Sequence, residues 1–306
     1  MRRVLRAGTR GSLLAQRQTS WVAAKIREKL PGVEIEVVTI STRGDRQPGS
    51  LIPQVGEKGL FTRELERALL DGEIDFAVHS LKDLPTELLP GLTLGAVPVR
   101  ANPFDALVTR NKVSFDDLPS GTRIGTSSLR RAAQIRHARP DLIVTPLRGN
   151  VDTRIRKLEQ GLVDALILAA AGLERMGWSS RDYCQLPPEV FLPAPGQGAL
   201  AVEVRADDPL MQDVCAVLDD PPVRYAVTAE RAFLKSLGGG CQLPVGALAV
   251  VEDDRLWLRG SVIRRDGKAL VKGEISGDPT QASLLGEMLA NDLLAKGAKE
   301  ILENEG

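Results

Sequence analysis

The sequence predicts an α/β protein made of two related lobes and a small C-terminal α+β domain. Three observations predict this class: apolar strand-like and amphipathic helical segments alternate over residues 1–98, the same plan recurs over residues 99–198, and consecutive strand-like runs dominate the tail. We therefore expect a first lobe from residues 1–98 together with 199–218. A second lobe is expected from residues 99–198 and a third domain from residues 219–306.

The first lobe is predicted to open with a strand over residues 4–8 and a helix capped by Ser12. The apolar face of this helix is expected to contain Leu14, Trp21, Val22 and Ile26. Alternation of Val33, Ile35 and Val37 then predicts a strand. Next, we expect a helix that begins after Phe61, turns Leu65 and Leu69 inward and ends at Gly72. A buried strand over residues 74–78 would deliver residues 79–83 at its carboxyl end.

The second lobe repeats short pieces of the first. Residues 125–128 lead into a helix as residues 8–12 do, and residues 156–164 parallel residues 67–75. The order of these matches suggests two similar lobes, although chance remains the alternative because each match is short. Residues 98–104 and 193–200 would be the two crossovers. Because ligands of open α/β sheets lie outside the carboxyl ends of the strands, we expect the site in a cleft between the lobes.

The chain returns to the first lobe through residues 201–204 and a helix near 210–218. The tail is expected to form a helix over 227–237, strands over 245–251, 256–263 and 269–275, and a last helix whose apolar residues are Leu284, Met288, Leu289 and Leu293. In the first lobe, residues 41–59 form a long segment with four glycines and two prolines. A connection of this length is typically functional or disordered, and we interpret it as a mobile flap.

Composition excludes several classes of function. Forty basic residues balance 40 acidic ones and aromatic residues make up 4%, which argues against nucleic acid and membrane surfaces as partners. Three cysteines without a CxxC pair oppose a disulfide framework and a structural zinc site, and His79 and His137 lie too far apart in sequence for a metal motif. The chain has no long apolar run, so we expect a soluble cytoplasmic protein.

Basic residues gather where strands should end and helices begin. Thr126, Ser128, Arg130 and Arg131 lie at one such helix start, whose free N–H groups and positive dipole end attract anions. Further candidates at strand ends are Arg10, Ser12, Arg148 and Arg154. Solvated arginines paired with acids are the alternative. Recurrence of arginine at the strand ends of both lobes favours a polyanionic ligand, since guanidinium groups bind carboxylates in a bidentate manner.

Two further residues carry chemistry. Asp83 is a carboxylate among these cations: it either completes a turn before Pro85 or pairs with an arginine, or it stabilises a developing cation and handles its protons. Cys241 follows three glycines, so it lies either in a tight turn that contains sulfur or on a loop that presents a thiolate for covalent attachment. Cys184 and Cys215 are expected to behave as small buried apolar residues.

Seven segments together resemble the porphobilinogen deaminase, or hydroxymethylbilane synthase, family. In family order they are TRGS at 9–12, EKGLF at 57–61, HSLKD at 79–83, GTSSLRR at 125–131, LRGN at 147–150, PGQGA at 195–199 and GGCQ at 239–242. The resemblance implies that the two lobes are periplasmic-binding-protein-like with a cleft between them. It also implies a monomer that carries a dipyrromethane cofactor on a thioether to Cys241 and condenses four porphobilinogens head to tail with loss of ammonia, without a metal.

The resemblance also implies roles for individual residues. Asp83 would stabilise the azafulvene-type cation that forms as the amine leaves. The cofactor would be held by Cys241, Lys82, Asp83, Thr126, Ser128, Arg130, Arg131, Gly172 and Gln197. Substrate carboxylates would be bound by Arg10, Ser12, Arg148, Arg154 and Arg175, and Lys58 and Phe61 would belong to the flap. A two-lobed anion-binding protein without catalysis is the competing hypothesis, but it gives no role to Cys241 or to the third domain.

Overall fold

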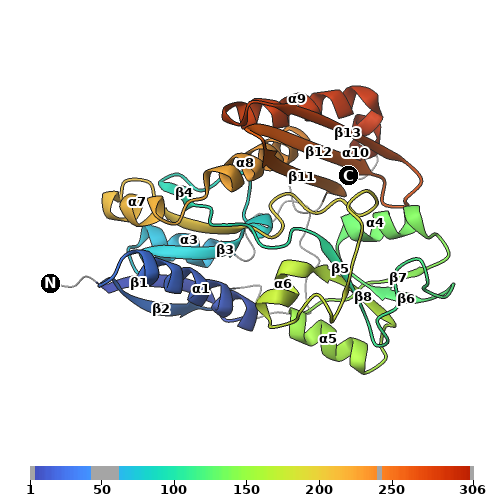
Figure 1. Ribbon diagram of the computed structural model, residues 1–306, viewed down its shortest axis with the longest axis horizontal. Helices are drawn as coiled ribbons and strands as arrows, with labels where there is room; N and C mark the ends of the chain where they lie inside the picture. The colour runs from blue at the N-terminus through green and yellow to red at the C-terminus, as the bar shows by residue number, and fades with distance from the viewer. Residues whose placement is uncertain (1–3, 43–61, 240–242, 304–306) are drawn as a thin grey trace. The chain divides into compact units, whose positions relative to one another are not determined.

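The computed structural model describes residues 4–42, 62–239 and 243–303, and the chain divides into two compact units (Figure 1). The first unit contains residues 1–100 and 199–224, and the second contains residues 101–198 and 225–306. The described residues form two five-stranded sheets and one three-stranded sheet. The predicted fold class, two α/β lobes and a small C-terminal α+β domain, is confirmed. The finer domain boundaries expected at residues 98, 198 and 218 stay a prediction.

The first sheet has the strand order β2-β1-β3-β10-β4. Its strands are β1 Val4–Arg10, β2 Glu34–Ile40, β3 Phe76–Ser80, β4 Leu92–Ala96 and β10 Leu200–Arg205. The first three run parallel to one another, whereas β10 is antiparallel to both of its neighbours. The return of the chain after residue 198 therefore supplies the strand that joins β3 to β4.

Helices cover both faces of this sheet. Helices α1 Leu13–Lys29 and α7 Pro209–Ala216 pack on one face, and α3 Arg63–Leu70 packs on the other. Because side chains alternate across a strand, Phe76 and Val78 of β3 face α1 and α7, whereas Ala77 faces α3. The cap by Ser12 and the burial of Leu65 and Leu69 are confirmed.

The strand predicted from the alternation of Val33, Ile35 and Val37 is confirmed as β2, an edge strand in which Ile35 is buried and Val37 is 41% exposed. Two other predictions about this lobe are wrong in detail. Trp21 is 37% exposed, because α1 packs on the sheet mainly through Val22, Ala23 and Ile26. The strand expected over residues 74–78 begins two residues later, since Asp75 binds Arg6 instead of extending it.

The second sheet has the order β7-β6-β8-β5-β9 and the same directions as the first. Its strands are β5 Asp105–Thr109, β6 Arg123–Gly125, β7 Ile143–Thr145, β8 Ala165–Ala169 and β9 Cys184–Gln185. Helix α4 Leu129–Ala138 covers one face, and α5 Val151–Glu159 and α6 Ala170–Arg175 cover the other. In each sheet the fourth strand in this order, β10 or β5, is antiparallel to both of its neighbours.

A shared polar contact confirms that the lobes are structural repeats. In the first, the backbone N–H of Arg6 donates to Oδ2 of Asp75 (2.8 Å), and its guanidinium donates to the carbonyl oxygen three residues before that aspartate (2.8 Å). In the second, Arg123 makes the same two bonds with Asp164 (3.0 Å) and with the carbonyl three residues before it (3.0 Å). The sequence similarity between residues 67–75 and 156–164 therefore corresponds to the same local structure in both lobes.

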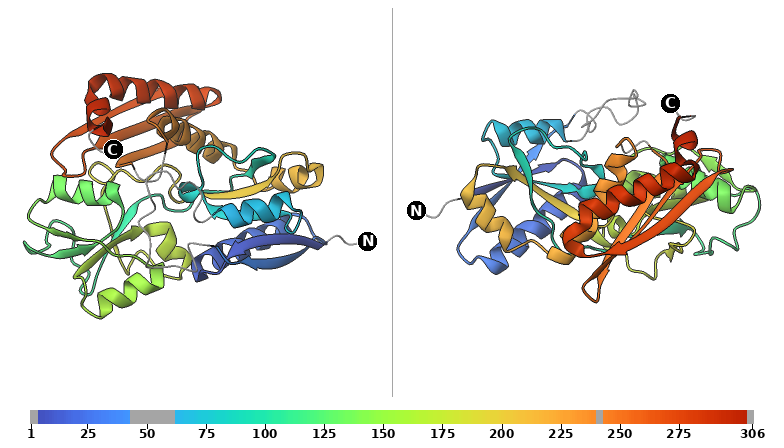
Figure 2. Two further views of the ribbon diagram at one scale, coloured as in Figure 1. Left: turned by 180° about the vertical axis from the view of Figure 1, so that it is seen from behind. Right: turned by 90° about the horizontal axis from the view of Figure 1, so that it is seen from above.

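The C-terminal part of the second unit is an antiparallel sheet in the order β11-β12-β13, covered by helices (Figure 2). Its elements are α8 Pro221–Ser236, β11 Val245–Glu252, β12 Arg255–Ile263, β13 Leu270–Gly277, the 3₁₀ turn Pro279–Gln281, α9 Ala282–Leu293, the π-type turn Leu294–Ala298 and α10 Lys299–Glu303. Helix α9 buries Leu285, Leu289 and Leu293. Leu284 and Met288 were predicted on its apolar face but are 49% and 48% exposed. The face of α9 that packs on the sheet is centred on Leu285, Leu289 and Leu293 instead.

Candidate active site

Asp83 lies on a short 3₁₀ turn, Leu81–Asp83, directly after β3. Leu81 and Leu84 are buried on either side, and the backbone N–H of Leu84 donates to the carbonyl of Leu81 (3.1 Å). This packing fixes the turn while the Asp83 side chain stays exposed and that of Lys82 half-buried. The two neighbouring candidates therefore project from a rigid strand end, as the sequence predicts.

The β1–α1 junction of the same unit holds Arg10 and Ser12. Arg10 is the last residue of β1, and Ser12 caps α1 by accepting a hydrogen bond from the N–H of Ala15 (3.3 Å). The cap satisfies one of the free donors of the helix start and leaves the others near these side chains. An anion-binding role for this junction agrees with that geometry.

The corresponding junction of the second unit joins β6 to α4. Ser128 caps α4 and accepts from the N–H of Arg131 (3.4 Å), and the hydroxyl of Thr126 accepts from the N–H of Ser128 (3.2 Å). Ser127 donates its hydroxyl to the carbonyl of Leu147 (2.9 Å), which ties this turn to the segment that follows β7. The predicted helix start with its hydroxyl groups is therefore present.

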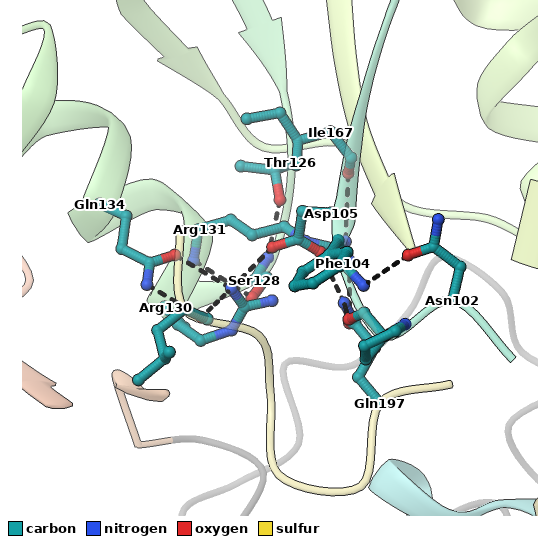
Figure 3. Close-up of polar contacts among 12 residues, drawn as sticks. Asn102, Phe104, Asp105, Thr126, Ser128, Arg130, Arg131, Gln134, Ile167 and Gln197 are labelled. Carbon is teal, nitrogen blue, oxygen red and sulfur yellow. Dashed lines mark hydrogen bonds and ion pairs between the residues drawn. The ribbon is translucent and has the colours of Figure 1, made fainter. Parts of the chain in front are cut away.

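Arg130 and Arg131 enclose a buried carboxylate that the sequence analysis missed (Figure 3). Asp105, the first residue of β5, is fully buried; its Oδ2 accepts from Nη1 of Arg130 (2.7 Å) and its Oδ1 from Nη2 of Arg131 (2.7 Å). Burial by itself raises the pKa of Asp105, but the two guanidinium groups outweigh it and hold that pKa far below its usual range. Burial lowers the pKa of Arg130, and Asp105 partly offsets this.

Amide side chains complete this cluster. Gln197 is fully buried and donates from Nε2 to Oδ1 of Asp105 (2.9 Å) and to the carbonyl of Pro103 (2.7 Å). Gln134 accepts from Nη1 of Arg130 (3.0 Å) and donates to the carbonyl of Leu192 (3.0 Å). The two cations and one anion leave one net positive charge beside the start of α4. Arg130 and Arg131 thus donate hydrogen bonds to Asp105 and to other buried groups of the second lobe, such as Gln134 and Gln197.

Arg148 and Arg154 lie around the start of α5. Arg148 is exposed, and Arg154 donates from Nε to the carbonyl of Gly149 (2.8 Å), one helical turn earlier. Gly149 has φ +120°, and a Cβ there would lie 2.8 Å from the Thr153 side chain, so the chain turns sharply between the two arginines. Arg148 therefore lies just before α5 and Arg154 in the first turns of that helix.

Arg175, another of the predicted substrate-binding arginines, ends α6 and is half-buried. Its Nη2 donates to the carbonyl of Gly198 (2.8 Å), and burial lowers its pKa to about 10, partly opposed by Glu174. Gly172 is buried in the same helix. Gly198 has φ +89°, and a Cβ there would lie 2.5 Å from the carbonyl oxygen of Ala101, so only glycine fits this position. A half-buried cation of this kind is stabilised by an anionic partner.

Three predicted residues, Lys58, Phe61 and Cys241, lie outside the described residues. Of the other cysteines, Cys215 is 2% exposed and burial raises its pKa to about 12, whereas Cys184 is only half-buried. Within residues 4–42, 62–239 and 243–303, no three acidic, histidine or cysteine side chains are arranged to hold a metal ion. In that same part of the chain, no helix combines the length and apolar character that a membrane span needs.

Comparisons with known proteins identify the family to which the chain belongs. A family model described as "Porphobilinogen deaminase, dipyromethane cofactor binding domain" matches residues 5–213, and one described as "Porphobilinogen deaminase, C-terminal domain" matches residues 224–295. Porphobilinogen deaminase of Syntrophobacter fumaroxidans is 48% identical over 98% of this chain and 97% of its own length. That of Pelotomaculum thermopropionicum is 50% identical over 99% of this chain and 97% of its own.

Among solved structures, the methionine-binding protein MetQ aligns with a TM-score of 0.45 and 13% identity, covering 70% of this chain and 89% of its own. Both family models fit in chain order, and the relatives match from end to end. The chain therefore belongs to the porphobilinogen deaminase family.

Proposed function

We propose that this chain is a hydroxymethylbilane synthase: it condenses four porphobilinogen molecules head to tail on a covalently bound dipyrromethane primer, releases one ammonia at each step, and frees the linear tetrapyrrole with water. The observation that carries this proposal is the full-length family match combined with an exposed carboxylate, Asp83, at the end of β3. The enzyme is proposed to act in the cytoplasm as a monomer.

The residues present fit a polycarboxylate cofactor. Nε of Arg130 is buried and has no hydrogen-bond partner within the described residues, which leaves one donor of the guanidinium cluster for a ligand. Thr126, Ser128 and the positive end of α4 lie beside it. Lys82, Arg131, Gly172 and Gln197 complete the set of residues proposed to hold the cofactor, with Cys241 as its attachment point. When bound, the cofactor would supply the free pyrrole carbon to which the first substrate is joined, and each later substrate would be joined to the ring added before it.

Asp83 is proposed to act on the substrate. As the aminomethyl group leaves as ammonia, positive charge develops on the pyrrole, and a carboxylate near the ring nitrogen stabilises it by electrostatics and by accepting the N–H hydrogen bond. The new carbon–carbon bond replaces the carbon–nitrogen bond, and a ring proton is released. Asp83 is the acidic group placed to take part in that proton transfer, and its exposure gives the substrate access.

The guanidinium groups are proposed to bind acetate and propionate side chains. Each pyrrole carries two carboxylates, so a growing chain needs many cations, which Arg10, Arg148, Arg154 and Arg175 provide together with the cap of Ser12. Lys58 and Phe61 are proposed to belong to a flap. A catalytically inactive anion-binding protein would use the same arginines but would have no use for Asp83.

The test is the intact mass of the denatured protein before and after addition of porphobilinogen, together with ammonia release. We expect the purified protein to exceed its chain mass by two porphobilinogens less two ammonias, and Cys241→Ser to lack this excess. An apo preparation should gain the same mass on incubation with substrate. Binding of porphobilinogen without ammonia release or added mass would instead support the non-catalytic hypothesis.

A further inference from the structure

A buried polar pair lies on the α3 face of the first sheet, and the mechanism above does not use it. Nε2 of His79 is 2.9 Å from Oε2 of Glu203, and the side chains are 4% and 0% exposed. The two residues are 124 positions apart in sequence and meet because β10 pairs with β3. In that register Glu203 lies opposite Ala77 and His79 opposite Ala201, so the pair is diagonal across one face.

The surroundings of this pair make its burial unfavourable for the free energy of folding. Oε1 of Glu203 is buried and lacks a hydrogen-bond partner within the described residues. Glu66 of α3 is 3% exposed on the same face, and its pKa is raised by burial first and by Glu203 second. Replacing a buried polar pair of this kind with well-packed apolar residues often leaves a protein equally stable or more stable, because an unsatisfied buried carboxylate oxygen is destabilising. Stability alone therefore does not account for the pair.

The pair lies next to other bonds that fix the end of β3. Ser80, the residue after His79, accepts a hydrogen bond at Oγ from Nε2 of the buried Gln18 (2.9 Å). The N–H of Leu81 donates to the carbonyl of Ala199 (3.0 Å), the residue before β10. Three consecutive residues of β3 and its turn are thus bonded to α1 and to the β10 segment, and the 3₁₀ turn with Asp83 follows at once.

We propose that His79 and Glu203 are positioning residues for Asp83: their contact fixes the β3–β10 register from which the catalytic turn projects. The proposal rests on the function proposed above. Asp83 is exposed, so its position depends on where the buried backbone beneath it is held. A shift of about 1 Å at a catalytic group is enough to reduce turnover on the order of 100-fold.

The test compares Glu203→Gln with Asp75→Asn. Asp75 is an equally buried carboxylate just before β3, at the end far from the turn, and it pairs with Arg6 and with Arg205 of β10 (3.5 Å). It is therefore a control for loss of a buried carboxylate that contacts β10 away from the turn. We expect Glu203→Gln to lower kcat about 10- to 100-fold with little change in KM, since the arginines are untouched. Asp75→Asn should keep the kcat of the parent enzyme, even where it loses as much stability.

A second readout does not depend on activity. Hydrogen exchange of the Leu81 amide, which is bonded to Ala199, should be faster in Glu203→Gln than in Asp75→Asn. Equal kcat and equal Leu81 exchange in the two variants would overturn the proposal. If the parent enzyme releases no ammonia from porphobilinogen, the proposed function fails, while Leu81 exchange still decides whether the pair fixes the turn. If Glu203→Gln does not fold, Glu203→Asp, which keeps the charge but shortens its reach, undergoes the same two measurements.

Discussion

At the scale of single residues, Asp83 and Asp105 have opposite surroundings and therefore opposite uses. Asp105 is buried between two guanidinium groups and holds them in place. Asp83 is exposed on a turn whose neighbours are buried. A buried, paired carboxylate orients its partners, whereas an exposed one on a rigid strand end is available to a ligand.

Asp83→Asn should reduce turnover by about 100-fold or more while the anion-binding residues keep their affinity for substrate. The amide retains the shape of the carboxylate but cannot stabilise a cation or accept its proton. Ammonia release under single-turnover conditions, beside equilibrium binding of porphobilinogen, measures the two effects separately. Retention of the parent rate would remove Asp83 from the mechanism.

Arg148→Ala should slow elongation more than it disturbs folding. The Arg148 side chain is exposed, so its removal leaves no cavity, and surface substitutions usually change stability by about 0.5 kcal/mol or less. The rate of successive substrate additions, followed by mass, and the urea midpoint together check this. Arg156→Ala is the control, since Arg156 lies on α5, the helix that follows Arg148, is exposed and has no proposed role.

At the scale of elements, each lobe presents its ligand-binding groups at a strand–helix junction. Ser12 and Ser128 cap equivalent helices, α1 and α4. In each lobe a short segment of small and polar residues joins the preceding strand to this cap. These junctions could be predicted because a cap residue, a preceding glycine and the helical pattern are all local signals.

The contacts that could not be predicted are those that depend on strand order. Asp105 begins the apolar strand β5, and no local sequence pattern indicates which residues it pairs with. Arg130 and Arg131 contact it only once α4 packs on β5. His79 could not be matched with Glu203 from the sequence, because β10, which pairs with β3, follows the whole second lobe in the chain. The exposed Trp21 shows the same limit, since sequence patterns do not reveal which residues of a helix meet the sheet.

Ser128→Ala should lower the free energy of unfolding by about 1 kcal/mol and also raise KM. The hydroxyl caps α4 and is one of the groups proposed to bind the cofactor. Asp208→Ala, which removes the cap of α7, should lose at least as much stability with no change in KM, because Asp208 also pairs with Arg205. Urea unfolding and steady-state kinetics test both variants. A Ser128→Ala enzyme with unchanged KM would limit Ser128 to the cap.

At the scale of the whole molecule, acid stability should depend on the charges that join elements within each unit. The pKa of Asp105 is held far below its unfolded value of about 4, so its contribution to stability is complete above pH 4 and is lost as the pH falls below that value. Asp105→Asn should remove this part of the pH dependence and destabilise the protein at pH 7 by about 3–5 kcal/mol, since two buried cations lose their anion.

Urea midpoints measured from pH 7 down to pH 3 check this expectation. Asp164→Asn is the control: arginine hydrogen bonds lower the pKa of Asp164 to about 2, but its side chain is 35% exposed and water screens it. It should therefore lose less stability at pH 7. An unchanged acid slope in Asp105→Asn would mean that other carboxylates determine acid unfolding.

The late position of β10 in the sequence has a consequence for synthesis on the ribosome. All strands of the second sheet lie between residues 105 and 185, but the first sheet is completed only by residues 200–205. The lobe that begins the chain therefore cannot finish folding until the other lobe has been translated. Until β10 has been translated, the edges of β3 and β4 that pair with it are unpaired, and His79 lacks its partner Glu203.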